Sequence, residues 1–221
     1  MFLTNFNEFV ANLAVITTII QFLSGILVCR QYVVNRTTAE ASPLPFICGF
    51  LSSGLWLLYG ICKPDSKIII VNVVGVLLML SYSIVFYVYT FKKSSVLKQS
   101  LVAIILYLVM VVYMSTEIDN EILLVRLGYS ACLLTLLTIS APMSKLFYVI
   151  RTKCTDCLPF PMIFMSFIVS SLWFIYGCIV QDVFLSIPNF IGASLAVAQL
   201  SLFVVYPSVP QTPLLLKMTE A

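Results

Sequence analysis

Apolar residues run along the chain in seven long stretches that are separated by short polar segments. The apolar stretches cover about residues 9–29, 44–62, 67–91, 97–116, 125–150, 159–180 and 184–206. Each is close to the 20 or so residues that a helix needs to cross the hydrocarbon core of a bilayer. Charges and helix-breaking residues gather between them, at 30–42, 63–67, 92–98, 117–121 and 151–156. The pattern predicts an all-α membrane protein with seven transmembrane helices.

Composition narrows the class of protein further. Hydrophobic residues make up 61% of the 221 residues and charged residues only 10%, whereas a soluble domain has about 25% charged residues. Seven spans with short loops use nearly the whole length, so no room is left for an aqueous enzyme domain. The chain also has no His, which excludes Ser-His-Asp triads and His-ligated zinc or haem. We therefore expect no enzyme, no cofactor and no nucleic acid partner.

The seven cysteines give no strong sign of a metal or redox site. Five of them lie in or next to apolar stretches, where a free thiol behaves as a small hydrophobic group. Cys154 and Cys157 form one CxxC pair, but a structural zinc site needs four ligands and no second pair is near. We expect no metal site.

The distribution of basic residues predicts the orientation in the membrane. With the amino terminus outside, the inner side receives nine Lys and Arg residues and the outer side only three, which fits the positive-inside rule. The carboxyl terminus is then cytosolic. Asn35 begins a glycosylation sequon that this topology places in the cytosol, so a glycan at Asn35 would overturn it. The resident membrane, plasma membrane or Golgi and other endomembranes, stays open.

The chain matches itself when it is shifted by 117 residues. The shift aligns the second and third apolar stretches with the sixth and seventh. Phe50, Ser53, Leu55-Trp56, Tyr59-Gly60, Asp65, Asn72, Gly75, Phe86 and Tyr89 align with Phe167, Ser170, Leu172-Trp173, Tyr176-Gly177, Asp182, Asn189, Gly192, Phe203 and Tyr206. Apolar composition alone would not keep Trp, Asn, Asp and Gly in step, so the match indicates a duplicated three-helix unit.

Two three-helix units joined directly would have opposite orientations in the membrane. One extra helix between them restores a common orientation, which agrees with the basic residues on one side. The prediction is a 3+1+3 architecture of parallel repeats of three-helix bundles about an axis along the membrane normal. Its parts are a first repeat at 1–95, a linker helix at 96–120, a second repeat at 121–207 and a cytosolic tail at 208–221.

The doubled motif Pro-Phe, Leu-Trp-x-x-Tyr-Gly and Asn-x-x-Gly resembles the SWEET sugar transporters. The resemblance runs from about Phe22 to Tyr206, and the motifs are specific when taken together. It implies a transporter whose partners are a small neutral sugar and membrane lipid, with a homo-oligomer as an open question.

Two tryptophans and two asparagines are the candidate substrate-binding residues. Trp56 and Asn72 flank the turn near Pro64 at about 6 residues each, which places both roughly 9 Å below the helix ends. Trp173 and Asn189 repeat this arrangement. Indole faces and amides suit the C–H faces and hydroxyls of a sugar, although each Asn could also join helices and each Trp could be an interfacial anchor. The resemblance implies the same four positions as substrate contacts.

Prolines are candidates for an inner gate or hinge, because proline removes a backbone donor and weakens a helix locally. Pro142 lies within the fifth span, whereas Pro45 and Pro161 start the second and sixth, where proline is also merely favourable. In the SWEET family four prolines, from the first, second, fifth and sixth helices, frame the inner gate. This chain departs from that pattern, because the 117-residue shift pairs Pro142 with Gly25.

Four residues near the outer turns are candidates for an outer gate. Tyr59, Asp65, Tyr176 and Asp182 could close the site through hydrogen bonds. They could equally be interfacial tyrosines and solvated loop charges.

The spans hold no acidic residue in their cores, where ion-coupled transporters bind their ion. We therefore expect a facilitative, bidirectional uniporter of neutral mono- or disaccharides that works by alternating access. The alternative is a proton-coupled amino-acid transporter of the PQ-loop kind, but this chain has Pro45-Phe46 and Pro161-Met162 in place of Pro-Gln. A non-transporting seven-helix receptor or scaffold fits less well, because a duplicated three-helix unit is foreign to the receptor fold.

Overall fold

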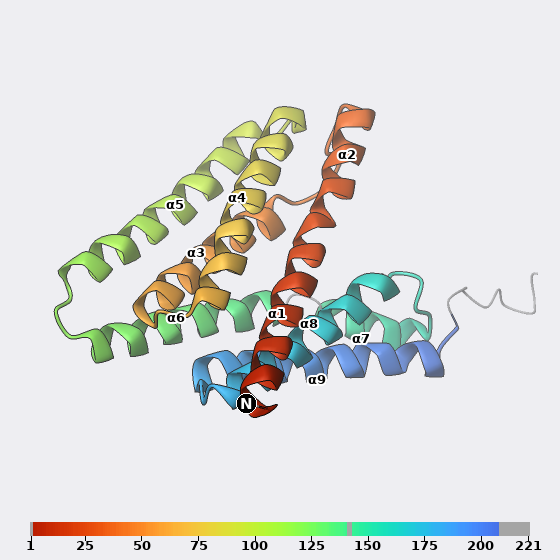
Figure 1. Ribbon diagram of the computed structural model, residues 1–221. Coiled ribbons are helices and arrows are strands. Elements are labelled where there is room, and N and C mark those ends of the chain that lie inside the picture. Colours follow the sequence, from red (N-terminus) through yellow and green to blue (C-terminus); the bar gives the residue numbers. More distant parts are fainter. Residues whose placement is uncertain (1, 141–142, 208–221) are drawn as a thin grey trace, which may run out of the picture.

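The computed structural model describes residues 2–140 and 143–207, and all regular structure in this part of the chain is helical (Figure 1). The helices are α1 (Phe2–Leu23), α2 (Gly25–Asn35), α3 (Leu44–Cys62), α4 (Ser66–Tyr89), α5 (Lys93–Thr116), α6 (Asn120–Ser140), α7 (Met143–Thr152), α8 (Phe160–Ile179) and α9 (Val183–Val205). Among the described residues, seven helical segments are long and apolar enough to cross a membrane, with α1–α2 and α6–α7 each forming one segment. The expected all-α, seven-span membrane class is confirmed.

The first span is longer than the sequence pattern predicted. The prediction ended it at residue 29 and began a loop at Arg30, but the helix continues to Asn35 and ends where Arg36 turns to a left-handed conformation with φ 56°. The prediction was wrong because it followed hydrophobicity alone. Arg and Gln are good helix formers, so Arg30 and Gln31 extend the helix beyond its apolar stretch.

A break at Ser24 divides the first span into α1 and α2. The Tyr82 hydroxyl of α4 donates to the Phe22 carbonyl at 3.0 Å, so this carbonyl has a partner outside its own helix. Gly25 allows the approach, because a Cβ at this position would lie only 2.4 Å from the Tyr82 ring. Tyr82 therefore contacts the first span directly at the break. Pro142, the predicted counterpart of Gly25, lies outside the described residues.

The two repeats exchange contacts in a reciprocal way. Within each repeat the last two helices pack closely, α3 with α4 and α8 with α9. Between the repeats, α1 packs against α8, and its counterpart α6 packs against α3. The linker helix α5 lies mainly against α3. The side-chain bonds of Trp56 and Trp173 described below lie along these two inter-repeat contacts.

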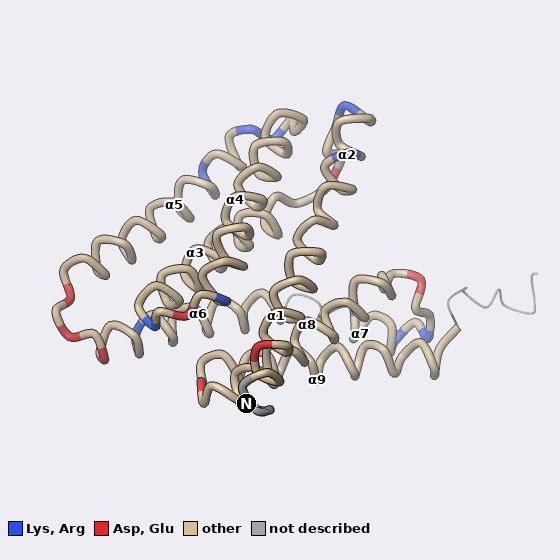
Figure 2. The backbone as a smooth tube through the Cα atoms, viewed as in Figure 1, with Lys and Arg blue, Asp and Glu red and all other residues tan. Residues whose placement is uncertain are grey.

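The repeats meet at one end and diverge at the other (Figure 1). We call the side that holds the α3–α4 turn (63–65) and the α8–α9 turn (180–182) the turn end, and the opposite side the basic end. In Figure 1 α3 to α5 rise towards the top while α8 and α9 run to the right, away from the region where α1 crosses α8. Lys and Arg gather towards the diverging helix ends, whereas acidic residues mark the α5–α6 loop (Figure 2).

Candidate functional site

The turn end is closed by hydrogen bonds that run between the repeats. The Tyr59 hydroxyl in α3 donates to Asp182 Oδ2 at 2.9 Å, and the Tyr176 hydroxyl in α8 donates to Asp65 Oδ2 at 2.8 Å. Each aspartate also caps the helix that follows it, since its other oxygen accepts from backbone N–H groups, such as that of Leu185 for Asp182. The cap fixes each carboxylate in place, so the four predicted outer-gate residues form two reciprocal pairs.

Lys63 adds an ion pair that the sequence reasoning missed. Its ammonium group bonds Asp182 Oδ2, and the Asp182 side chain is only 1% exposed. The 117-residue shift pairs Lys63 with Val180, so the second repeat has no equivalent cation. The turn end is therefore asymmetric, because Asp182 is bound by both Tyr59 and Lys63 whereas Asp65 has no such cation among the described residues.

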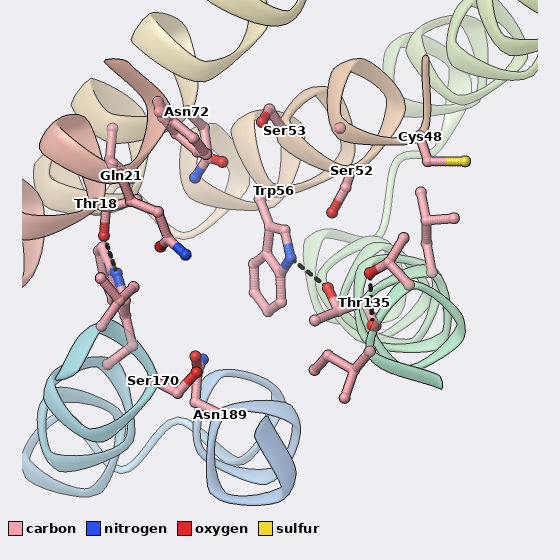
Figure 3. Close-up of a pocket in the computed structure, with 18 of the residues that line it drawn as sticks. Thr18, Gln21, Cys48, Ser52, Ser53, Trp56, Asn72, Thr135, Ser170 and Asn189 are labelled. Carbon is pink, nitrogen blue, oxygen red and sulfur yellow. Dashed lines mark hydrogen bonds between the residues drawn. The ribbon is translucent and has the colours of Figure 1, made fainter. Parts of the chain in front are cut away.

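The tryptophans form a second layer directly below these pairs. Trp56 Nε1 donates to Thr135 Oγ1 at 3.0 Å, and Trp173 Nε1 donates to Thr18 Oγ1 at 2.8 Å (Figure 3). Both bonds cross between repeats, from α3 to α6 and from α8 to α1. Each indole also meets the neighbouring tyrosine edge-on, with ring centroids 5.4 Å apart for Trp56 and Tyr59. Each indole is thus held by a ring contact with a tyrosine and by a hydrogen bond from its N–H to a threonine.

The threonines were not singled out from the sequence, although a signal was present. Thr18 and Thr135 are 117 residues apart, the same shift that relates the tryptophans. They lie in the first helix of each repeat, where the residue matches are otherwise sparse. The match between the repeats was followed along the second and third helices of each repeat, so this pair in the first helices was not found.

The asparagines face the space between the tryptophans. Each donates one amide N–H to the carbonyl four residues earlier in its own helix, Asn72 to Ile68 and Asn189 to Leu185, both at 2.8 Å. Figure 3 shows both side chains directed towards the same open space as Trp56. One amide hydrogen of each asparagine is therefore used locally, and the rest of the amide is available to a ligand.

These side chains line one cavity of about 800 Å³. The cavity reaches Leu44 and Pro45 in the first turn of α3 and Ile139 near the end of α6, so it extends towards the basic end. None of the described residues in its lining is charged. The polar lining consists of hydroxyl, amide and indole groups, from Thr18, Gln21, Ser52, Ser53, Trp56, Asn72, Thr135, Thr138, Ser170, Trp173 and Asn189. The volume falls within the range of about 300–1,000 Å³ that is typical of small-molecule sites.

The predicted inner-gate residues are only partly gathered at the cavity. Pro45 lines it, whereas Pro161 in the first turn of α8 and Gly25 in α2 lie outside its lining. Pro142 lies outside the described residues. Of the three described residues only Pro45 reaches the cavity, so the gating role of all four residues stays a prediction.

Pro188 is a buried helix-breaking residue that the sequence reasoning missed. It lies inside α9, directly before Asn189, and has no N–H to donate to the Phe184 carbonyl. The Cys132 thiol of α6 donates to that carbonyl instead, with Sγ and the oxygen 2.9 Å apart. Cys132 was predicted to be a small hydrophobic group. It also acts as a polar partner that joins α6 to the α9 turn leading to Asn189.

Comparison with known proteins identifies the family. The sequence profile described as "Sugar efflux transporter for intercellular exchange" matches residues 8–94 and again 125–211. The second match begins 117 residues after the first, which is the shift found within the sequence. The chain belongs to the SWEET family. This is a family of transporters and not of enzymes.

Relatives of this SWEET chain occur in animals and plants. It is 43% identical over 202 residues to "Sugar transporter SWEET1" of Drosophila pseudoobscura pseudoobscura, which covers 90% of this chain and 89% of that protein. It is 31% identical to "Bidirectional sugar transporter SWEET16" of Oryza sativa subsp. japonica, over 90% of this chain and 62% of that protein. A solved eukaryotic SWEET transporter has the same fold, with a TM-score of 0.85, 18% identity, and coverage of 92% of this chain and 98% of that one.

Proposed function

We propose that this SWEET chain is a facilitative, bidirectional uniporter of neutral sugars that works by alternating access. The observation that carries the proposal is the uncharged cavity with paired Trp and Asn side chains, closed at the turn end and extending towards the basic end. A site that reaches one side only is what a carrier needs in one half of its cycle. The names of the relatives, which describe sugar transporters, support sugar as the solute.

The chemistry of the lining suits a pyranose ring better than an ion or an amino acid. Trp56 and Trp173 offer apolar faces for ring C–H groups, while Asn72 and Asn189 offer amides that both donate and accept. An amino acid carries two charges, and the described lining has no residue of opposite charge to receive either one. This disfavours the alternative of a PQ-loop amino-acid transporter. The cavity volume accommodates a monosaccharide, and a disaccharide is the larger candidate.

The carboxylates near the site already accept hydrogen bonds within the protein. Asp65 and Asp182 cap α4 and α9 and accept hydrogen bonds from the gate tyrosines. Proton or sodium coupling needs an ionisable group in contact with the transport pathway. We infer that the solute gradient alone drives transport, in either direction.

In the proposed cycle the cavity is closed alternately at the turn end and at the basic end. Separation of Tyr59 from Asp182 and of Tyr176 from Asp65 opens the cavity at the turn end. Closure at the basic end brings the start of α3 at Pro45 towards α6, with Pro142, Pro161 and Gly25 as the proposed bending points. The topology that we infer from the basic residues makes the turn end extracellular or lumenal, with the amino terminus on that side and the carboxyl terminus in the cytosol.

Counterflow in proteoliposomes tests the proposal. Vesicles of the purified protein are loaded with unlabelled sugar and diluted into a trace of labelled sugar at equal pH and ion concentrations on both sides. Transient accumulation of label is expected for at least one sugar in a panel of mono- and disaccharides. Matched vesicles with a proton gradient serve as the comparison. Transport that occurs only with the proton gradient, or of amino acids but no sugar, would refute the uniporter.

A further inference from the structure

A second cavity of about 330 Å³ lies outside the transport pathway, in the crevice between α3 and the linker helix α5. We call it the α3–α5 crevice. Its walls are Leu44, Ile47, Cys48 and Leu51 from α3 and Lys98, Gln99, Val102, Ala103 and Leu106 from α5. The linker helix packs on α3 but has no counterpart against α8, so the crevice belongs to the first repeat alone.

The crevice runs along the helix axes, with a charged residue at one of its ends. α3 begins at Leu44 and α5 at Lys93, so both helices start at the basic end and run in the same direction. Lys98 and Gln99 therefore lie at the mouth nearest the basic end, and Leu106 lies about 12 Å deeper by helical rise. The surface of the crevice itself is apolar, and Lys98 and Gln99 line it with the hydrocarbon parts of their side chains. A ligand that fits carries a charged head and an apolar tail along the membrane normal.

The charge at the mouth is positive and available. Lys98 is exposed, and no carboxylate of the described residues lies within ion-pairing distance of it. The neighbouring cations have partners: Lys92 pairs with Glu40 at 3.0 Å, and the Lys93 ammonium lies 5.6 Å from the Tyr87 ring centre. Lys98 is thus the cation that can receive an anion at this point.

We propose that the α3–α5 crevice binds one anionic glycerophospholipid from the leaflet at the basic end. An acyl chain fills the apolar crevice, and the phosphate pairs with Lys98. Leu44 and Cys48 line both this crevice and the transport cavity. The first turns of α3 are therefore a shared wall, and the bound chain supports from the lipid side the wall that bounds the sugar pathway.

Native mass spectrometry of the purified full-length protein tests the site without any transport measurement, so its outcome is independent of the proposed function. The protein is titrated with phosphatidylserine or phosphatidylcholine of identical acyl chains. We expect one phosphatidylserine to bind about fivefold more tightly than phosphatidylcholine, as one surface cation contributes to anionic-lipid binding. Lys98→Gln should remove this preference, whereas Lys93→Gln, at the same end but outside the crevice, should keep it.

Two further arms examine the acyl chain. Val102→Trp should fill the crevice and abolish the single tight site, while Leu101→Trp, on the lipid-exposed face of the same helix, should leave it intact. Soluble glycerophosphoserine should not displace the lipid, because it has no chain to bury. Equal binding of the two lipids, a preference that survives Lys98→Gln, or displacement by the soluble headgroup would each overturn the proposal.

Discussion

The hydroxyl of Tyr59 donates to both carboxylate oxygens of Asp182, at 3.0 and 2.9 Å, across the boundary between the two repeats. Tyr59 is 1% exposed and Asp182 4% exposed, so the contact is shielded from solvent. The reciprocal contact joins Tyr176 to Asp65 without a lysine. The two halves of the closed turn end therefore share a geometry but differ in strength, because only Asp182 binds a cation as well.

Loss of the Asp182 charge should open the turn end more than loss of the Asp65 charge. Asp182→Asn removes the ion pair with Lys63 and weakens the bond from Tyr59; hydrogen bonds to a charged group contribute about 1.5–3 kcal/mol. We expect the population open at the turn end to rise about tenfold or more. The native thiol Cys48 lines the cavity and reports this opening to an impermeant maleimide added at the turn end.

The labelling experiment has matched controls in the same chain. Subtracting the signal of Cys48→Ser removes the contribution of the other cysteines. Asp119→Asn changes an acid in the α5–α6 loop that lies apart from the closed layer, and it should label as slowly as the parent protein. Equal labelling rates for Asp182→Asn and Asp119→Asn would show that Asp182 does not hold the turn end closed.

The cavity asparagines should be required for transport but not for membrane insertion. Asn72→Ala or Asn189→Ala removes the amide that faces the cavity, and we expect each to reduce uptake to background while surface expression persists. Ser201→Ala, which changes an exposed side chain of α9, serves as the control. Uptake by radiolabelled sugar and surface biotinylation are measured on the same cells. Normal transport by both asparagine variants would remove them from the site.

Thr135 should affect sugar affinity by positioning Trp56. Thr135→Val keeps the shape of the side chain but removes the acceptor of the indole N–H, at a cost of about 0.5–1.5 kcal/mol. We expect a rise in KM of about threefold to tenfold, with the maximal rate little changed. Thr135→Ser keeps the acceptor and should restore the parent KM. A variant pair with indistinguishable KM values would mean that the bond has no part in binding.

The sequence could predict the fold because the membrane imposes simple rules on it. Apolar length predicts seven spans, and the 117-residue match through Trp56 and Asn72 predicts which helices correspond. The depth of a residue in the membrane can also be predicted, because it follows from the number of residues between it and the helix end. This count predicted that the Trp and Asn side chains lie at one level. These predictions depend on local pattern or on translation along one axis.

Features that depend on rotation and on contacts between distant helices could not be predicted in this way. The 117-residue match between Thr18 and Thr135 shows that the two threonines correspond, but it does not show that Thr18 accepts a hydrogen bond from Trp173. Lys63 aligns with Val180 and not with a second lysine, so a comparison that looks for identical residues in the two repeats does not find the Lys63 ion pair. The contact between Cys132 and the Phe184 carbonyl depends on the angle between α6 and α9, and no spacing in the sequence encodes that angle.

Cys132 should stabilise the protein only as long as Pro188 is present. Pro188 leaves the Phe184 carbonyl without its helical donor, and the Cys132 thiol takes that place. Cys132→Val leaves a partly buried carbonyl unpaired, which costs about 1 kcal/mol and lowers Tm by about 2–4 °C per kcal/mol for a chain of this size. Pro188→Ala restores a backbone N–H that can bond the same carbonyl. In that background Cys132→Val should therefore have almost no further effect.

A double-mutant cycle measured by thermal unfolding in detergent separates this bond from simple packing. The four proteins are the parent, the two single variants and the double variant, with the exposed Cys178→Val as a control for loss of a thiol. A coupling of about 1 kcal/mol is the expected result, because the thiol and the restored N–H are alternative donors to one acceptor. Additive effects within about 0.3 kcal/mol would mean that Cys132 contributes packing alone. Cys132→Ser keeps a donor, so its Tm should lie nearer to that of the parent than the Tm of Cys132→Val does. If the KM values for sugar follow the same order, the bond also helps to position Asn189.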